Sequence, residues 1–231
     1  MMPRFGLLTP LVLAASLLAA SNQAESKHAK SDVPPDVDPN SSFWRGAPAI
    51  FLENDSRGNP VPGFRTEVRS RWTAENLYFL FISPYEELYL KPEPRTDVET
   101  NQLWNWDVAE AFIGSDFHNI RRYKEFEVSP QSEWVDLDIN LDAPRHEDGW
   151  LWNSGFKAAA RIDRGAKRWY AFMRIPYTSV DTRSAAVGNL LRINFFLSEG
   201  ARPNHKGLAW QATGRATFHA PEAFGLLKLV P

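Results

Sequence analysis

The residues best suited to bind a ligand lie in the segment WNWDVAEAFI, residues 104–113. If a β-strand starts at Trp106, Trp106 and Glu110 share one of its faces, because alternate side chains of a strand point to the same side. Glu110 then lies among apolar neighbours, so its carboxyl group is expected either in a buried network or in a pocket. Asp107 stands at the start of the strand, where the alternative role is to fix the loop while the tryptophans fill the core.

Several tryptophans lie outside the clear strand pattern, in segments that carry Gly, Asn, His or Asp: Trp104, Trp150, Trp152 and Trp210. Large aromatic side chains in loops indicate recognition more than packing, although some cover the edges of sheets. Flat aromatic faces pack against the C–H faces of pyranose rings, and carboxylates accept hydrogen bonds from sugar hydroxyl groups. Together with WNWDVAEAFI, these tryptophans predict a sugar-binding surface.

The sequence lacks the common catalytic patterns. It has no Gly-x-Ser-x-Gly elbow, no Walker loop, no zinc spacing among its histidines and no cysteine. A glycoside hydrolase needs two carboxyl groups about 5 to 9.5 Å apart across one bond. Asp107 and Glu110 are three residues apart, so on one strand they point to opposite faces. We therefore predict a protein that is not an enzyme, with a glycoside hydrolase as the weaker alternative.

The elements that position these residues follow a period of two, which is typical of β-strands. Three hairpins are expected, and no segment has a sustained helical pattern, although short helices are expected around 85–89 or 184–187. About eight to ten strands joined by short turns predict an all-β fold, an antiparallel β-sandwich of immunoglobulin-like or jelly-roll-like type. The expected strands lie at residues 65–73, 77–82, 106–113, 123–128, 133–141, 155–162, 168–175, 190–197 and 224–230.

The composition excludes several classes of protein. The 231 residues include 26 Lys and Arg and 28 Asp and Glu, which gives a formal net charge of −2. Positive residues are interleaved with acidic ones, so we expect no nucleic-acid partner. The 43% hydrophobic and 23% charged content is that of an ordinary globular protein.

The start of the chain has the pattern of a secretory signal peptide. Arg4 precedes an apolar run, and small residues follow up to Ala24. The run is shorter than the roughly 20 residues of a spanning helix, so we expect residues 1–24 to be removed on export to the periplasm or the medium, with no membrane span left. Residues 25–42 are rich in charge, Pro and Ser and are expected to be a flexible linker. One domain, 43–231, remains.

Six motifs follow one another in an order that resembles carbohydrate-binding module family 9, in its secreted bacterial form, within the wider DOMON-like group of β-sandwiches. Each motif is weak alone, but six in family order cover most of the chain. They are TEVRSRWTAENLYFLF at 66–81, WNWDVAE at 104–110, FEVSP at 126–130 with Asp136 after it, Trp169 leading into Arg174-Ile175-Pro176, RINF at 192–195 and HAPEAFG at 219–225.

The resemblance implies a non-catalytic module in which two tryptophans clamp a terminal sugar, often the reducing end, of a plant-type glycan, in support of carbohydrate catabolism. By motif position, Trp104 corresponds to the first clamp residue and Glu110 to an acceptor for a sugar hydroxyl group. Trp210 is the expected second clamp, and Trp106 is the alternative to Trp104.

The same resemblance implies polar contacts from nearby acidic, amide and basic side chains. Asp107, Asn194 and Arg192 are the candidates, the last two because they share a strand face. Family members can carry structural calcium, which the acidic loops permit, and no other cofactor is required. The chain departs from the family at Phe172, where relatives usually carry Glu ahead of Arg-Ile-Pro, so a different packing is expected there.

Two further classes stay open. A haem-binding DOMON-type domain needs axial ligands, and Met173 is the one methionine left after removal of the leader, in phase with the core face of its strand. A structural or protein-interaction sandwich would use its tryptophans to cover sheet edges or a partner surface.

Overall fold

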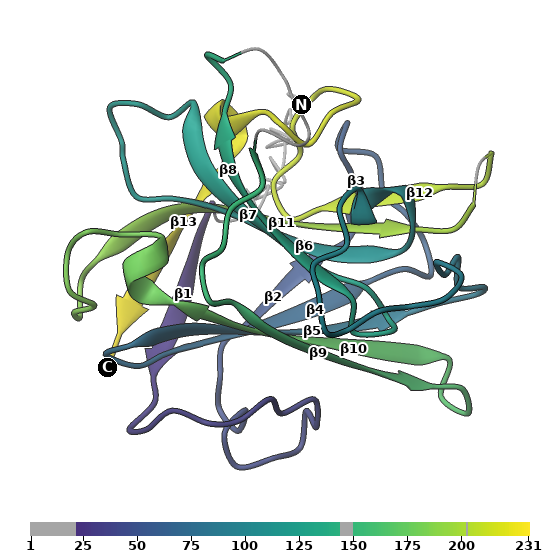
Figure 1. The fold of residues 1–231 in the computed structure, drawn as a ribbon, viewed down its shortest axis with the longest axis horizontal. Helices are drawn as coiled ribbons and strands as arrows, with labels where there is room; N and C mark the ends of the chain where they lie inside the picture. Colours follow the sequence, from purple (N-terminus) through teal and green to yellow (C-terminus); the bar gives the residue numbers. More distant parts are fainter. Residues whose placement is uncertain (1–21, 144–149, 202) are drawn as a thin grey trace, which may run out of the picture.

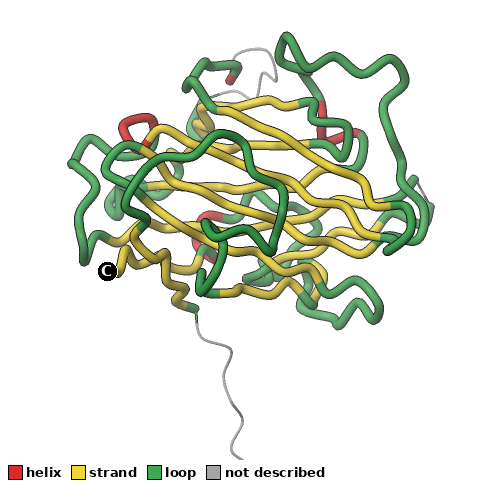
Figure 2. Tube along the Cα trace, turned by 90° about the horizontal axis from the view of Figure 1, so that it is seen from below, coloured by secondary structure: helices red, strands yellow, loops and turns green. Residues whose placement is uncertain are grey.

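The computed structural model describes residues 22–143, 150–201 and 203–231, and these form a β-sandwich (Figures 1 and 2). Short 3-10 helices occur at η1 (Leu103–Asn105), η3 (Tyr177–Ser179) and η4 (Pro221–Ala223). The strands are β1 (Gln23–His28), β2 (Ala49–Leu52), β3 (Asn54–Asp55), β4 (Thr66–Trp72), β5 (Asn76–Pro84), β6 (Val108–Gly114), β7 (Arg122–Val128), β8 (Trp134–Asn140), β9 (Lys157–Asp163), β10 (Arg168–Pro176), β11 (Leu190–Glu199), β12 (Lys206–Ala209) and β13 (Gly225–Val230).

The strands form one continuous series of hydrogen-bonded neighbours, in the order β8-β7-β6-β11-β13-β1-β4-β5-β10-β9. The series folds back on itself, so that β7 near one end contacts β9 and β10 at the other. We call β8-β7-β6-β11-β13 the β6 sheet and β4-β5-β10-β9 the β5 sheet. Pairing within each is antiparallel, as predicted, but β1 joins the two sheets by pairing parallel with both β13 and β4.

Alternating apolar side chains fill the space between the two sheets. Phe79 and Phe81 of β5, Trp169 of β10 and Phe195 of β11 are all fully buried there. The rings of Phe79 and Phe195 meet edge to face, 5.0 Å between centroids. Burial of a large apolar side chain contributes about 1.5–3 kcal/mol, so this layer holds the sheets together.

A further apolar cluster lies on the outer face of each sheet, against irregular segments of the chain. On the β5 sheet, Tyr78, Leu80 and Phe172 are buried with Trp44 from the segment that precedes β2. On the β6 sheet, Phe112 is part of a second outer cluster. Phe172 thus packs in an apolar layer, which accounts for its departure from the Glu expected at that position.

The three predicted hairpins are confirmed as the antiparallel pairs β4–β5, β7–β8 and β9–β10. The strand expected from residue 106 begins two residues later, because η1 precedes it. The short helices expected at 85–89 and 184–187 are wrong: both segments are loops. Both segments span five residues or fewer, and so short a helix is not stable on its own.

The prediction of a flexible linker at 25–42 is wrong, because the described domain begins at β1. Ala24 and Ser26 of this strand are buried, and Ser70 Oγ donates to Ser26 Oγ at 2.7 Å. Beyond β1, Asp32 accepts hydrogen bonds from the hydroxyl groups of Thr73 (2.6 Å) and Tyr78 (2.7 Å). The sequence pattern does not reveal this strand, because its buried residues are small and its pairing partners are distant in sequence.

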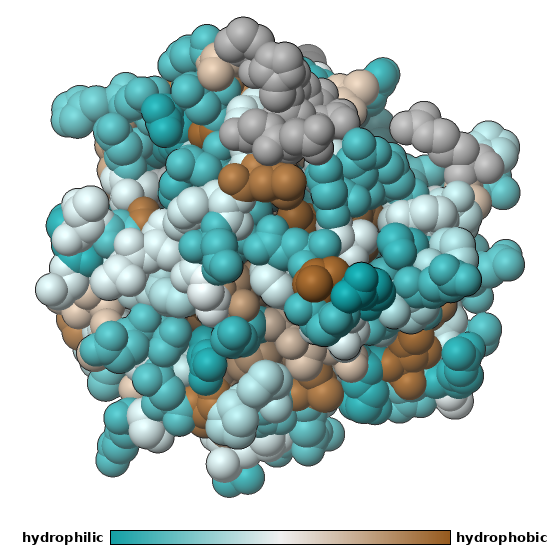
Figure 3. Space-filling view, in the orientation of Figure 1, coloured by the Kyte–Doolittle hydropathy of each residue, from teal (hydrophilic) through white to brown (hydrophobic). Residues whose placement is uncertain are grey.

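The predicted signal peptide falls mostly on residues 1–21, outside the described residues. Within the described ranges, no helix has the length and apolar character needed to cross a membrane. On the face shown in Figure 3, hydrophilic residues separate the apolar ones into small patches. Large apolar side chains that are exposed are spread along the chain: Tyr89, Val98, Phe117, Leu151 and Val187.

Candidate functional site

A pocket of about 960 Å³ lies over the outer face of the β6 sheet. Residues from β3, β6, β7, β8, β11 and β12 form part of its lining, and the rest comes from the segments that connect the strands. Its aromatic lining residues are Tyr89, Trp104, Phe112, Trp150 and Phe218, and its polar ones include Glu110, Glu125, Ser198, His205, Lys206 and His219.

The alternation of β6 decides which of its residues reach the pocket. Val108 and Phe112 belong to the outer cluster, and Glu110 between them lines the pocket, whereas Ala109 and Ala111 face the interior between the sheets. The prediction that Glu110 lies among apolar neighbours on its strand face is therefore confirmed. The carboxyl group of Glu110 is buried and accepts a hydrogen bond from Ser198 Oγ at 3.1 Å.

The structure separates the two tryptophans that precede β6. Trp104 in η1 is partly exposed and lines the pocket. Trp106 is not part of the pocket lining and instead packs against Tyr89, 5.0 Å between ring centroids. Of these two candidates, only Trp104 lines the pocket.

Asp107 is buried and holds two loops together. The backbone N–H groups of Tyr89 (2.7 Å) and Gly200 (2.6 Å) donate to its two carboxylate oxygens. Burial raises the pKa of Asp107 to about 6, although the two N–H groups oppose this shift. Its carboxylate is absent from the pocket lining, so the loop-fixing role is the one that the structure supports.

Arg192 does not reach the pocket, which corrects its prediction as a sugar contact. Its guanidinium group lies over Gly114, where a Cβ atom would come within 2.5 Å of Nη2. Nε donates to the carbonyl of Asp116 at 3.0 Å, and Nη2 donates to that of Ile120 at 3.4 Å. Burial lowers the pKa of Arg192. The side chain therefore anchors the loop between β6 and β7.

Asn194 is likewise used by the fold rather than by the pocket. It is fully buried; its Oδ1 accepts from the backbone N–H of Gln211 (3.0 Å), and its Nδ2 donates to the Gln211 carbonyl (2.8 Å). These bonds fix the segment that follows β12.

We expect Asn194→Ala to lower the free energy of unfolding by on the order of 2–4 kcal/mol, because both backbone groups of Gln211 lose their buried partner. Urea denaturation followed by tryptophan fluorescence measures this change. Exposed Asn105 provides the matched control, since Asn105→Ala removes the same amide from the surface. Equal midpoints for the two variants would contradict the anchoring role.

Trp210 packs on the opposite side from Trp104, which corrects its prediction as the second clamp. Along β12, Leu208 faces the interior and Ala209 the outer cluster, and Trp210 turns inward again. Its ring lies 6.0 Å from that of Phe195 and covers Gly225, where a Cβ would meet the indole at 2.6 Å. The pocket wall is completed instead by other aromatic residues, including Phe218, which stacks on Phe196 at 4.2 Å.

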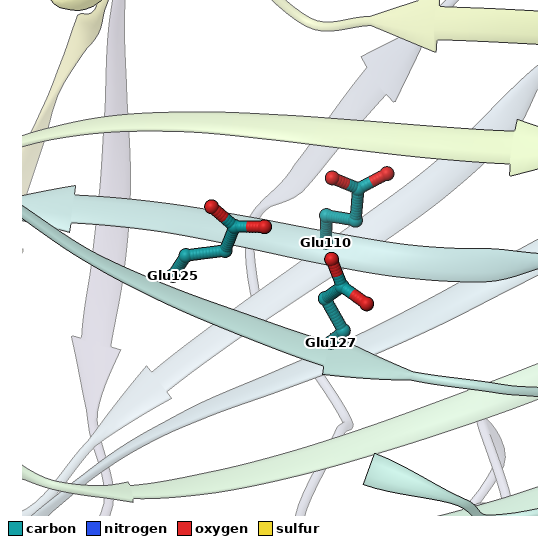
Figure 4. Close-up of side chains that lie close together, drawn as sticks. All are labelled: Glu110, Glu125 and Glu127. Atoms are coloured by element: carbon teal, nitrogen blue, oxygen red, sulfur yellow. The ribbon is translucent and has the colours of Figure 1, made fainter. Parts of the chain in front are cut away.

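Three glutamates meet at the floor of the pocket (Figure 4). The register of β6 and β7 pairs Glu110 with Glu127 and Phe112 with Glu125, so the three carboxyl groups lie on one face. All three are buried, and one oxygen of each lies within 4.8 Å of the others. Burial, followed by the charge of Glu125, raises the pKa of Glu110; burial, then Glu110 and Glu125, raises the pKa of Glu127.

Sequence reasoning assigned no role to Glu125 and Glu127. The signal was present in YKEFEV, where the two glutamates alternate with Phe126 and Val128 on one strand. Their proximity to Glu110 depends on the pairing register, which alternation alone does not supply. Met173, the candidate haem ligand, is fully buried between the sheets.

Comparison with known proteins gives one sequence relative and several similar folds. No protein-family model matches the chain. A protein of Arthroderma benhamiae described as "Extracellular protein" is 25% identical over 179 residues, which cover 71% of this chain and 78% of the relative.

Three solved structures share the architecture at low sequence identity. A Bacteroides uniformis protein, provisionally described as carbohydrate-binding, has a TM-score of 0.70 at 15% identity over 90% of this chain and 98% of that one. A family 9 carbohydrate-binding module of Caldicellulosiruptor kristjanssonii in complex with cellotriose gives 0.64 at 12% identity over 90% and 93%. One from the same organism in complex with glucose gives 0.60 at 13% over 89% and 95%. The chain therefore has the fold of carbohydrate-binding module family 9.

Proposed function

We propose that this chain binds carbohydrate, without catalysis, in the pocket lined by Trp104 and Glu110. The observation that carries the proposal is the composition of that pocket: a partly exposed tryptophan and further aromatic side chains surround buried carboxyl groups. Aromatic faces suit the C–H faces of a pyranose, and carboxyl oxygens suit its hydroxyl groups. The structural similarity to family 9 modules in complex with cellotriose and glucose supports the same function.

In this proposal Trp104 supplies the stacking platform, and Glu110 accepts a hydrogen bond from a sugar hydroxyl group. Phe218 and Trp150 line the same pocket, and in this proposal they replace Trp210 as the second aromatic contact to the sugar. A pocket of about 960 Å³ has room for one or a few sugar rings, so we propose that it receives a glycan end.

Hydrolysis by Asp107 and Glu110 is not supported by their placement. Glu110 lines the pocket, but Asp107 lies outside it with its carboxylate bonded to two backbone N–H groups. This separation supports binding without hydrolysis, because a glycoside hydrolase places its two carboxyl groups on either side of one glycosidic bond. An assay of reducing-sugar release from cellulosic and xylan oligosaccharides is expected to give no turnover; release would place the protein among the hydrolases.

Export is part of the proposal, as is a role in carbohydrate catabolism. The description of the Arthroderma benhamiae relative as extracellular supports export. Mass spectrometry of the protein recovered from the culture medium or periplasm would show whether the residues before β1 are removed.

We expect Trp104→Ala to weaken sugar binding at least tenfold, because an aromatic platform contributes about 1–3 kcal/mol at the centre of a small site. Isothermal titration calorimetry with glucose, cello-oligosaccharides and xylo-oligosaccharides measures the affinity, and the same sugars reduced to alditols test for end binding.

Trp210→Phe is the control for that experiment. It changes a tryptophan on the interior side and is expected to leave the affinity unchanged. Loss of binding in Trp210→Phe alone would restore Trp210 as the clamp residue. Absence of any sugar response from wild-type protein with an intact circular dichroism spectrum would overturn the proposed function.

A further inference from the structure

We propose that Glu110, Glu125 and Glu127 form a binding site for a divalent cation of the calcium class at the floor of the pocket. One oxygen from each of the three carboxyl groups lies within 4.8 Å of the other two, a spread that Ca–O bonds of about 2.3–2.6 Å can bridge from one centre. The set contains oxygen donors alone, which favours hard cations over zinc or copper. Mg²⁺ prefers shorter bonds of about 2.0–2.1 Å in a stricter geometry, so the larger ion fits better.

The side chain of Glu127 is the second observation that points to a ligand. Glu127 is 0% exposed, and neither carboxylate oxygen has a hydrogen-bond donor among the described residues apart from the neighbouring Glu125 carboxyl group. In Figure 4 its carboxyl group rises from β7 toward the space that it shares with Glu110 and Glu125. A buried carboxylate without a donor is costly unless a proton or a cation neutralises it.

Another buried glutamate of this region shows how the fold neutralises such a group when no ligand is involved. Glu133 is also 0% exposed, but Ser129 Oγ donates to it at 2.9 Å and the Lys91 ammonium group lies 3.7 Å away. No ion pair within the described ranges includes Glu110 or Glu127. The three-glutamate cluster therefore has the carboxyl groups that a cation site needs. Neither Glu110 nor Glu127 is paired with a lysine or arginine of the described residues.

The pocket gives an ion a route to this cluster. Glu110 and Glu125 both line the pocket, and Glu127 lies behind them. Ser198 Oγ donates to Glu110 Oε1 and so orients that carboxylate. Phe112 and Leu137 line the same floor, and their apolar surroundings strengthen the attraction between carboxylates and a cation.

The test uses the full chain, freed of metal with EDTA and desalted, in the absence of any sugar. Isothermal titration calorimetry and thermal unfolding with CaCl₂ are expected to show one site and a rise in the unfolding midpoint, with MgCl₂ giving weaker binding. Terbium luminescence excited through tryptophan gives a second readout, because Trp104 and Trp150 line the same pocket.

Glu127→Gln keeps the side-chain shape and is expected to weaken calcium binding at least tenfold. Glu125→Gln serves the same purpose if the first variant does not fold. Exposed Glu53, which pairs with Arg65, provides the control, and Glu53→Gln is expected to bind calcium as the wild type does. Folded wild-type protein without calorimetric, thermal or terbium response would overturn the proposal, and a loss of sugar binding alone would leave it standing.

Discussion

A chain that begins after His28 is expected to be unfolded or insoluble, because β1 is an interior strand of the sandwich. Five residues of β1 pair with β13, and Lys27 and His28 pair with β4. Removing β1 exposes two strand edges at once and breaks the continuous series that joins the two sheets. With about 0.5–1.5 kcal/mol for each lost hydrogen bond, the deficit is on the order of 5 kcal/mol, which is comparable to the whole stability of many domains.

Soluble yield and urea denaturation measure this effect. A chain that begins at residue 22, the first described residue, retains β1 and is the control for the truncation. Ser26→Asp and Lys27→Asp make a matched pair within the strand, since Ser26 is fully buried against Ser70 and Lys27 is exposed. If a chain starting at residue 29 unfolds at the same urea concentration as one starting at 22, β1 is dispensable and the linker prediction is restored.

The contrast between β1 and β5 shows which strands can be recognised from sequence. LYFLFI is apolar on both faces, and both faces of β5 are buried: Phe79 and Phe81 inward, Tyr78 and Leu80 outward. QAESKH is polar, and its place in the sandwich depends on β13 at the far end of the chain. A local pattern predicts a strand when the apolar side chains of that strand favour its burial. It fails when the strand is held mainly by backbone pairing with strands that are distant in sequence.

The candidate site shows the same division between local and non-local information. Alternation placed Glu110 on one strand face among apolar neighbours, and in the structure that face is the outer face of β6. Alternation also placed Arg192 and Asn194 on one face. It could not show that Arg192 is hydrogen-bonded to the carbonyl of Asp116, or that Asn194 is hydrogen-bonded to the backbone of Gln211. Their role as loop anchors follows from tertiary contacts between segments that are distant in sequence.

Glu125 and Glu127 illustrate the converse error. Their alternation was visible, but a carboxylate on a strand face is ordinarily solvated. Only the register that sets Glu127 opposite Glu110 turns two surface-like glutamates into a buried cluster. A pattern of three acidic residues on neighbouring strands therefore becomes chemically informative once the pairing is known.

Glu199 at the end of β11 gives the largest pH effect that we expect from a single residue. It is 2% exposed, and the groups that face it are Asp107, Glu86 and Lys206. Burial, followed by the charge of Asp107, raises the pKa of Glu199 from 4.5 to about 8, and Lys206 only partly opposes the shift. The folded protein therefore holds a proton on Glu199 at pH values where the unfolded chain has lost it.

The sign of the resulting pH dependence follows from this raised pKa. The stabilising contribution of the protonated group is fully present below about pH 4.5 and is lost as the pH rises toward 8. At about 1.36 kcal/mol per pKa unit, the loss amounts to on the order of 4–5 kcal/mol. Glu199→Gln keeps a neutral side chain at every pH. The free energy of unfolding of this variant, relative to that of the wild type, is therefore expected to increase by a few kcal/mol between pH 5 and pH 8.

Urea denaturation of both proteins at pH 5, 6, 7 and 8 measures this divergence. Burial raises the pKa of Asp107 to about 6, so Asp107 also makes the free energy of unfolding depend on pH. Both proteins contain Asp107, so its contribution cancels when their curves are compared, to the extent that its pKa is the same in both. Glu222→Gln, at an exposed position paired with Arg215, is the control and should run parallel to the wild type. Parallel curves for Glu199→Gln and the wild type would mean that Glu199 is charged in the folded protein, with Lys206 rather than burial deciding its state.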